Sequence, residues 1–260
     1  MTQLRFGDVS VALEAYIALV EIHRPPHNFF DADLIQNIAD AFEAMEREHE
    51  CWVIVLASEG KSFCAGANFH SRSSGGEEVA GTTSRLYQNA VRLFACSKPI
   101  VAAIQGAAIG GGLGLSLVAD FRVVSPDARF GANFVKLGIH PGFGLTYTLP
   151  RVIGTQKASL MFYTGRRISG EQALEWGLAD LIASPELVRQ EATKLAKEIA
   201  ECAPLAVQST RATMRREIIE SVKAQTAHEH AEQSRLFLTE DHKEGVKAVN
   251  ERRVGNFTGR

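Results

Sequence analysis

Cysteine is scarce in this chain, and its placement excludes some common metal sites. The four cysteines, Cys51, Cys64, Cys96 and Cys202, lie far apart among 260 residues, and no two form a Cys-x-x-Cys pair. Zinc ribbons need such closely spaced pairs. Unpaired thiols are typical of a reducing compartment. We therefore expect reduced cysteines, no zinc ribbon and no bound metal.

Long hydrophobic runs and an excess of charge are also missing. No apolar run approaches the roughly 20 residues that a membrane-spanning helix needs. Lys and Arg total 28 against 30 Asp and Glu, a net charge of −2, which indicates neither nucleic acid nor an anionic membrane as a partner. The first residues lack the basic and apolar segments of a signal or transit peptide. The sequence therefore predicts a cytoplasmic protein that binds no membrane and no nucleic acid.

Strands and helices alternate through the first two-thirds of the chain. Hydrophobic periodicity predicts strands within residues 9–24, 52–57, 98–106 and 121–125. It predicts helices at about 34–45 and 84–94, near 110, and over 185–202, 204–222 and 226–254. Ser169 and Gln172 have the spacing of a capping box, which marks another helix start. This order predicts an α/β core with a C-terminal helical region.

Four glycines stand within five positions in the segment AAIGGGLGLSLVAD, residues 107–120. A glycine is about 1 kcal/mol less favourable than alanine inside a helix, so the cluster implies a close approach of the backbone to another group. One interpretation is a tight turn from strand to helix with close packing. The other is a site where free backbone N–H groups bind a negatively charged oxygen. The number of glycines favours the second interpretation.

Familiar glycine-rich motifs do not account for this segment. A dinucleotide fingerprint would need glycine where Leu115 or Leu117 stands, and no Gly-Lys-Ser/Thr of a P-loop is present. A nucleophile elbow centred on Ser116 would need glycine in place of Val118. A nucleotide-binding α/β protein is therefore disfavoured.

Several motifs occur in order along the chain. KSFCAGANF at 61–69, GAAIGGG at 106–112 and LGIHPGFG at 137–144 are joined by RPPHN at 24–28, TGRRISGEQALEWGL at 164–178 and EGVKAVNERRVGNF at 244–257. Together they resemble the crotonase family, the enoyl-CoA hydratases and isomerases. The resemblance extends over nearly the whole chain.

The resemblance implies a fold, an assembly and a substrate class. The fold would be an α/β crotonase-like spiral of ββα units over residues 1–200, with a C-terminal helical trimerisation region over 201–260. The assembly would be a homotrimer or a dimer of trimers. The substrate would be an acyl-CoA thioester, as in fatty acid metabolism. Because CoA enters as part of that substrate, no separate cofactor is expected.

The resemblance also implies the position of an oxyanion hole. The two backbone N–H donors of the family match Ala67 and Gly111, where they would stabilise negative charge on the thioester oxygen. The positions that would contact the substrate or its CoA are Ala65, Asn68, Phe134 and Arg252. For Arg252 the alternative is a solvated basic face on a terminal helix.

The catalytic carboxylates of the hydratases are missing from this sequence. Their two glutamates match Gly114 and Phe134, and the aspartate that some isomerases carry after the proline matches Gly142. General acid–base groups contribute about 10²–10⁴-fold each, so ordinary hydration is expected to be weak. A phenyl ring and a bare glycine in place of two charges predict an apolar acyl pocket, suited to a bulky or aromatic acyl group.

Few side chains near these motifs offer the missing chemistry. His140 lies in the loop that carries catalytic carboxylates in relatives, and imidazole titrates near neutral pH; the alternative is a loop histidine engaged in packing. Asn68 and His70 follow Ala67 and could orient a substrate or water. Cys64 has no evident base partner, which favours a buried thiol over a nucleophile.

The sequence therefore predicts a crotonase-family enzyme, a lyase or isomerase that polarises an acyl-CoA or enoyl-CoA thioester through an oxyanion hole. Isomerisation, thioester hydrolysis and C–C cleavage stay open as its reaction. The alternative is a non-catalytic acyl-CoA-binding subunit, which would bind CoA thioesters without turning any of them over.

Overall fold

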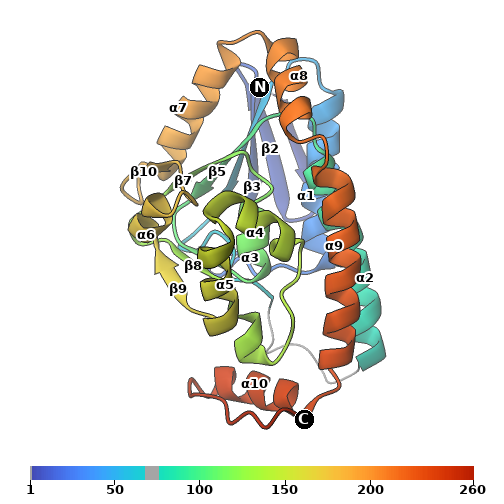
Figure 1. Ribbon diagram of the computed structural model, residues 1–260. Helices are drawn as coiled ribbons and strands as arrows, with labels where there is room; N and C mark the ends of the chain where they lie inside the picture. The colour runs from blue at the N-terminus through green and yellow to red at the C-terminus, as the bar shows by residue number, and fades with distance from the viewer. Residues whose placement is uncertain (1, 68–75) are drawn as a thin grey trace.

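A seven-stranded sheet forms the centre of the computed structural model, which describes residues 2–67 and 76–260 (Figure 1). The strand order is β1-β2-β3-β4-β5-β7-β10. β1, β2 and β3 pair antiparallel, and each later strand pairs parallel to its neighbour. The strands are β1 (Thr2–Phe6), β2 (Val9–Glu14), β3 (Ile17–Ile22), β4 (Val53–Ser58), β5 (Ile100–Ile104), β7 (Phe121–Val124) and β10 (Leu181–Ile182).

A smaller sheet carries the glycine-rich segment. Its strands are β6 (Ala107–Ile109), β8 (Arg129–Gly131) and β9 (Arg167–Ser169), in the order β6-β8-β9. β6 leads through Gly110, which has a φ of 58°, directly into the short helix α3 (Gly111–Ser116). The predicted helix is therefore present, whereas the short strand before it was not predicted.

Helices cover both faces of the large sheet. All six residues of β4 are buried, and the first five alternate between two hydrophobic clusters. Ile54 and Leu56 belong to the cluster that contains α1 (Ala32–Arg47), and Val53 and Val55 belong to the cluster that contains α7 (Val188–Ala200). A parallel strand covered on both faces has this uniformly apolar composition. The remaining helices are α2 (Gly76–Ala95), η1 (Asn133–Leu137), α4 (Leu145–Ile153), α5 (Thr155–Thr164), α6 (Gly170–Glu175), α8 (Pro204–Met214), α9 (Ile218–Leu236) and α10 (Glu240–Asn250).

The predicted capping box is confirmed at the start of α6. The Ser169 side chain accepts a hydrogen bond from the Gln172 N–H, and the Gln172 side chain accepts one from the Ser169 N–H. Two otherwise unpaired donors of the first turn are thereby satisfied.

The last helices do not follow the predicted boundaries. The helix predicted over 204–222 is two helices, because α8 ends at Met214 and α9 begins at Ile218. α9 then runs through the predicted gap before residue 226, and a second break separates it from α10. The break covers residues 215–217, and Glu217 at its end has near-helical angles, with φ −99° and ψ −6°.

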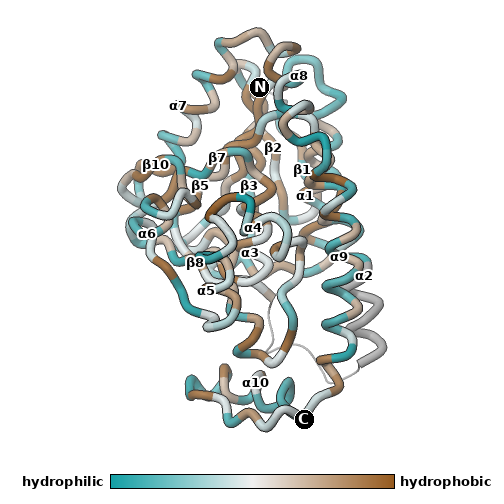
Figure 2. The backbone as a smooth tube through the Cα atoms, viewed as in Figure 1, coloured by the Kyte–Doolittle hydropathy of each residue, from teal (hydrophilic) through white to brown (hydrophobic). Residues whose placement is uncertain are grey.

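The C-terminal helices lie along one side and one end of the molecule. α9 lies beside α2, and α10 packs against η1 (Figure 1). α9 carries many hydrophilic residues, whereas hydrophobic residues are concentrated in the central strands (Figure 2). Among the helices of the described segments, none combines the length and apolarity needed to cross a membrane. The division at residue 200 stays a prediction.

Candidate functional site

Two chain segments that are far apart in the sequence bring Ala67 and Gly111 to one cavity. The Cys64 N–H donates to the Ala107 carbonyl at 2.8 Å, and the Ile109 N–H donates to the Cys64 carbonyl at 3.0 Å. Ala67 and Gly111 both line the cavity that follows. Among hydrogen bonds between described residues, none uses the Ala67 N–H, and a first helical residue such as Gly111 has no partner within its helix. Two such donors at one cavity wall can bind a carbonyl oxygen.

The glycines of α3 are required by packing as well. A Cβ atom at Gly111 would lie 1.9 Å from the Phe30 ring, and one at Gly112 would lie 2.0 Å from the Cys64 carbonyl oxygen. A Cβ at Gly114 would lie 2.7 Å from Phe143. Any of these contacts forces its neighbour to move. Close packing, the interpretation that the sequence favoured less, therefore accounts for three of the four glycines without a ligand.

The cavity is small and lined mostly by apolar side chains. The volume open to the centres of water-sized molecules is about 60 Å³, whereas a single water molecule needs roughly 10–15 Å³ on that measure. It is lined by Phe30, Ala67, Leu86, Tyr87, Gly111, Phe134, Ile139, Gly142, Phe143, Gln233 and Phe237. The predicted apolar character is present. The bulky or aromatic acyl group that the sequence also predicts stays a prediction.

The described lining residues include no carboxylate. Phe134 lies in this lining, whereas the space beside Gly114 is filled by Phe143. A Cβ at Gly142 would lie only 1.9 Å from the Tyr87 hydroxyl oxygen. Aromatic side chains therefore fill or border all three positions at which relatives place carboxylates by the sequence match.

His140 does not line the cavity. Its Nδ1 lies 2.7 Å from the Pro141 carbonyl oxygen, and its ring meets the His228 ring edge-on with centroids 5.9 Å apart. These contacts favour the packing role over the catalytic role for this histidine.

The other predicted site residues are placed as follows. The Ala65 N–H donates to the His27 carbonyl at 2.9 Å, beside the segment that leads to Ala67. Arg252 follows α10 in an exposed turn with a φ of 56°, and it does not line the cavity. Asn68 and His70 lie outside the described residues.

Cys64 is fully buried, and desolvation raises the pKa of its thiol to about 12. A thiol with that pKa is almost entirely protonated at neutral pH and is a poor nucleophile. The interpretation of Cys64 as a packing residue is therefore supported.

Three polar residues at or beside the cavity were not predicted from the sequence. They are Tyr87 on α2 and Glu229 and Gln233 on α9. The Tyr87 hydroxyl donates to Gln233 Oε1 at 2.8 Å, although 146 positions separate the two residues. No local pattern marks such a pair, because it depends on how α9 docks against α2.

Glu229 anchors the loop that carries Phe143. Its carboxylate accepts hydrogen bonds from the Gly144 N–H at 2.7 Å and from the Thr146 N–H and hydroxyl at 3.0 and 2.6 Å. The side chain is fully buried, and desolvation outweighs these hydrogen bonds and raises its pKa from 4.5 to about 7. A group on α9 thus holds one wall of the cavity.

We expect this carboxyl group to make the protein less stable as the pH rises from about 5 to about 7.5. In that range folded Glu229 keeps a proton that the unfolded chain has lost, so unfolding releases protons and higher pH favours it. Over this pH range the free energy of unfolding should fall by at most about 3 kcal/mol through Glu229. Glu229→Gln should flatten the pH dependence of the unfolding free energy, whereas Glu220→Gln, an exposed change on the same helix, should not. Parallel curves for wild type and Glu229→Gln would contradict this.

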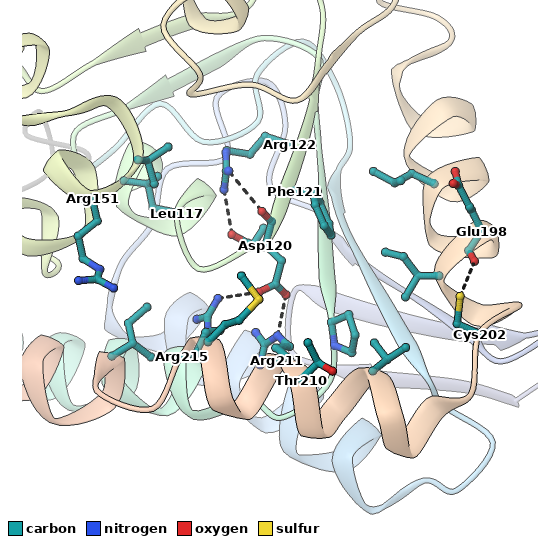
Figure 3. Close-up of a pocket in the computed structure, with 18 of the residues that line it drawn as sticks. Leu117, Asp120, Phe121, Arg122, Arg151, Glu198, Cys202, Thr210, Arg211 and Arg215 are labelled. Atoms are coloured by element: carbon teal, nitrogen blue, oxygen red, sulfur yellow. Dashed lines mark hydrogen bonds and ion pairs between the residues drawn. The ribbon is translucent and has the colours of Figure 1, made fainter.

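A larger hollow of about 800 Å³ lies away from this cavity, at the junction of α8 with β7 (Figure 3). Asp120 stands at its wall and accepts hydrogen bonds from Arg211 Nε at 2.8 Å and Arg215 Nη1 at 2.9 Å. The Ile100 N–H donates to the same carboxylate at 2.8 Å. Because its oxygens are bound to these donors, Asp120 joins α8 to the sheet and is not available as a catalytic base.

Known proteins match this chain along nearly its whole length. The family described as Enoyl-CoA hydratase/isomerase matches residues 12–260. A probable enoyl-CoA hydratase of Bacillus subtilis (strain 168) is 34% identical over 254 residues, which cover 96% of this chain and 98% of that protein. The crotonyl-CoA hydratase of Syntrophomonas wolfei is 32% identical over 257 residues, with 98% and 99% covered.

Solved structures agree with these sequence matches. The crystal structure of an enoyl-CoA hydratase/isomerase from Pseudoalteromonas atlantica T6c superposes with a TM-score of 0.86 and 27% identity, over 96% of this chain and 100% of that one. The α/β architecture of a largely parallel mixed sheet and C-terminal helices is thus the crotonase fold that the sequence predicts. On this evidence the chain belongs to the enoyl-CoA hydratase/isomerase family.

Proposed function

We propose that this protein binds an acyl-CoA thioester and acts on it, with the thioester oxygen held by the N–H groups of Ala67 and Gly111. A reaction that adds or removes a proton beside the thioester carbonyl places negative charge on that oxygen. Two backbone donors at the wall of a largely apolar, aromatic cavity stabilise such charge. The single observation that supports this is that both residues line one cavity.

Because the described lining residues include no carboxylate, reactions other than classical hydration are favoured. Classical hydration of an enoyl-CoA uses one group to activate water and another to protonate the α-carbon. Isomerisation, thioester hydrolysis and C–C cleavage all need the same stabilised oxygen. The lack of a carboxylate among the described lining residues also favours, as a second candidate, a subunit that binds acyl-CoA without turnover.

The remaining features of the proposal follow from family membership. The protein would act in the cytoplasm as a homotrimer or a dimer of trimers, and Arg252 would reach the CoA of a neighbouring subunit. CoA would enter with the substrate, and no other cofactor or metal would be needed.

The test removes one donor and keeps the fold. Ala67→Pro deletes the N–H, whereas Ala67→Gly retains it and serves as the matched control. Against a panel of acyl- and enoyl-CoA thioesters, we expect the fastest wild-type reaction to fall by about 10²–10³-fold in Ala67→Pro and to change little in Ala67→Gly. Calorimetric titration should show acyl-CoA binding by the wild type and both variants. A wild type that binds no acyl-CoA would refute the proposed function, and binding without any turnover would select the second candidate.

A further inference from the structure

Two phenylalanine rings cover the glycine face of α3 at the cavity. Gly111 and Gly114 are three residues apart, so they lie on one face of the helix. A Cβ at Gly111 would lie 1.9 Å from the Phe30 ring. A Cβ at Gly114 would lie 2.7 Å from the Phe143 ring. The two rings are neighbours, with centroids 6.0 Å apart, and both line the cavity, so an apolar wall lies beside Gly111.

Phe143 occupies this place in a backbone conformation that suits glycine. Its φ is 65°, in the left-handed region, where a side chain is disfavoured. Strained backbone of this kind concentrates at ligand-binding and active sites. Phe143 is nevertheless only 1% exposed, because its ring fills the space beside Gly114. The strain therefore accompanies a ring that shapes the cavity.

Two side chains of α9 hold the loop that carries this ring. Glu229 accepts a hydrogen bond from the Gly144 N–H at 2.7 Å, and Gln233 Nε2 donates to the His140 carbonyl at 2.7 Å. The backbone is thereby fixed one residue after Phe143 and three residues before it. A ligand that needed the space of the ring would have to displace a buried, hydrogen-bonded loop.

We propose that Phe143 determines which acyl group the protein accepts, and that its ring restricts the thioester to a short acyl chain. The inference rests on the proposed function, which places the thioester oxygen at the N–H groups of Ala67 and Gly111. The acyl chain begins at the carbon that carries this oxygen, so it enters the cavity beside Phe30 and Phe143. A short chain packs against the two rings, whereas each further methylene group competes with the Phe143 ring for the same space.

This expectation differs from the bulky or aromatic acyl group that the sequence predicts. Calorimetric titration of the wild type with acetyl-CoA, hexanoyl-CoA and benzoyl-CoA decides between them. We expect acetyl-CoA to bind at least as tightly as the other two, because the larger acyl groups cannot enter the space that Phe143 fills. A wild type that binds hexanoyl-CoA or benzoyl-CoA more tightly would overturn the restriction to a short chain.

Phe143→Gly removes the ring and suits the left-handed backbone. Burying one methylene group strengthens binding about fourfold, so two or more in the freed space should raise the preference for hexanoyl-CoA over acetyl-CoA by about tenfold or more. Phe143→Leu keeps an apolar side chain in case the glycine variant does not fold, and it should raise this preference by about fourfold. Phe42→Leu is the matched control, because Phe42 on α1 is also 1% exposed and does not line the cavity. It should keep the wild-type preference.

The same titrations separate this inference from the proposed function. If the wild type binds none of the thioesters, the proposed function fails and the inference fails with it. If the wild type binds them and both Phe143 variants keep its preference, the role of Phe143 alone is overturned. A shift of the same size in Phe42→Leu would likewise overturn that role, since any loss of core packing would then change the preference.

Discussion

Gly114→Glu will not turn this protein into an efficient hydratase. Gly114 matches a catalytic glutamate of the hydratases, so the substitution restores the expected residue type. However, a Cβ at this position would lie 2.7–3.0 Å from three atoms of Phe143, which is almost completely buried. The new side chain would collide with that ring before its carboxylate could reach the substrate.

The expected results are a slow wild type and a destabilised single variant. With two carboxylates missing, each worth about 10²–10⁴-fold, wild-type hydration of crotonyl-CoA should be at least about 10⁴-fold below that of a hydratase with both glutamates. Gly114→Glu should lower the free energy of unfolding by about 1–3 kcal/mol, the usual cost of overpacking a core. Its hydration rate, followed by loss of enoyl absorbance, should not exceed the wild-type rate.

Making room for the carboxylate should change that result. Phe143 has a φ of 65°, a backbone conformation that suits glycine, so Phe143→Gly removes the ring without straining the loop. The double variant, Gly114→Glu with Phe143→Gly, should hydrate crotonyl-CoA about 10²-fold faster than Gly114→Glu alone. Phe143→Gly by itself is the control and should hydrate crotonyl-CoA no faster than the wild type. A Gly114→Glu variant that is already fast, or a wild type within tenfold of an ordinary hydratase, would contradict the structural reason given for the missing activity.

The sequence predicts those parts of the fold that local patterns determine. The buried strand at β4, the amphipathic helix α1 and the capping box of α6 are present within a few residues of their predicted positions. Each depends on hydrophobic period or on side chains three residues apart, which one sequence shows directly. The motif order likewise identified the family that the full-length matches show.

The sequence does not predict features that depend on docking between distant segments. The polar pair in the cavity joins α2 to α9, and the glycines of α3 face a phenylalanine and a carbonyl group from other parts of the chain. The number of these glycines favours a ligand site, whereas the structure shows that packing requires glycine at three of the positions as well. The shape of the cavity depends on such docking too, because Phe143 fills the space beside Gly114.

Asp120 ends the same glycine-rich segment, and its removal should cause the largest loss of stability among these variants. Its carboxylate is largely buried, and it is paired with Arg211 and Arg215, which are also largely buried. Burial lowers the pKa of Arg215, and further N–H groups of both arginines have no hydrogen-bond partner among the described residues. Asp120 is therefore the group that compensates two desolvated positive charges.

Asp120→Ala should reduce the free energy of unfolding by about 3–5 kcal/mol, since breaking a buried ion pair leaves an uncompensated buried charge. Urea denaturation measures this change. Asp33→Ala is the control, because Asp33 and Arg85 form an exposed pair, and exposed pairs contribute about 0–1 kcal/mol. Asp120→Asn keeps an oxygen for the Ile100 N–H and should fall between the two. If Asp120→Ala were no more destabilising than Asp33→Ala, α8 would be held to the sheet by its apolar contacts alone, and the ion pairs would contribute nothing to the fold.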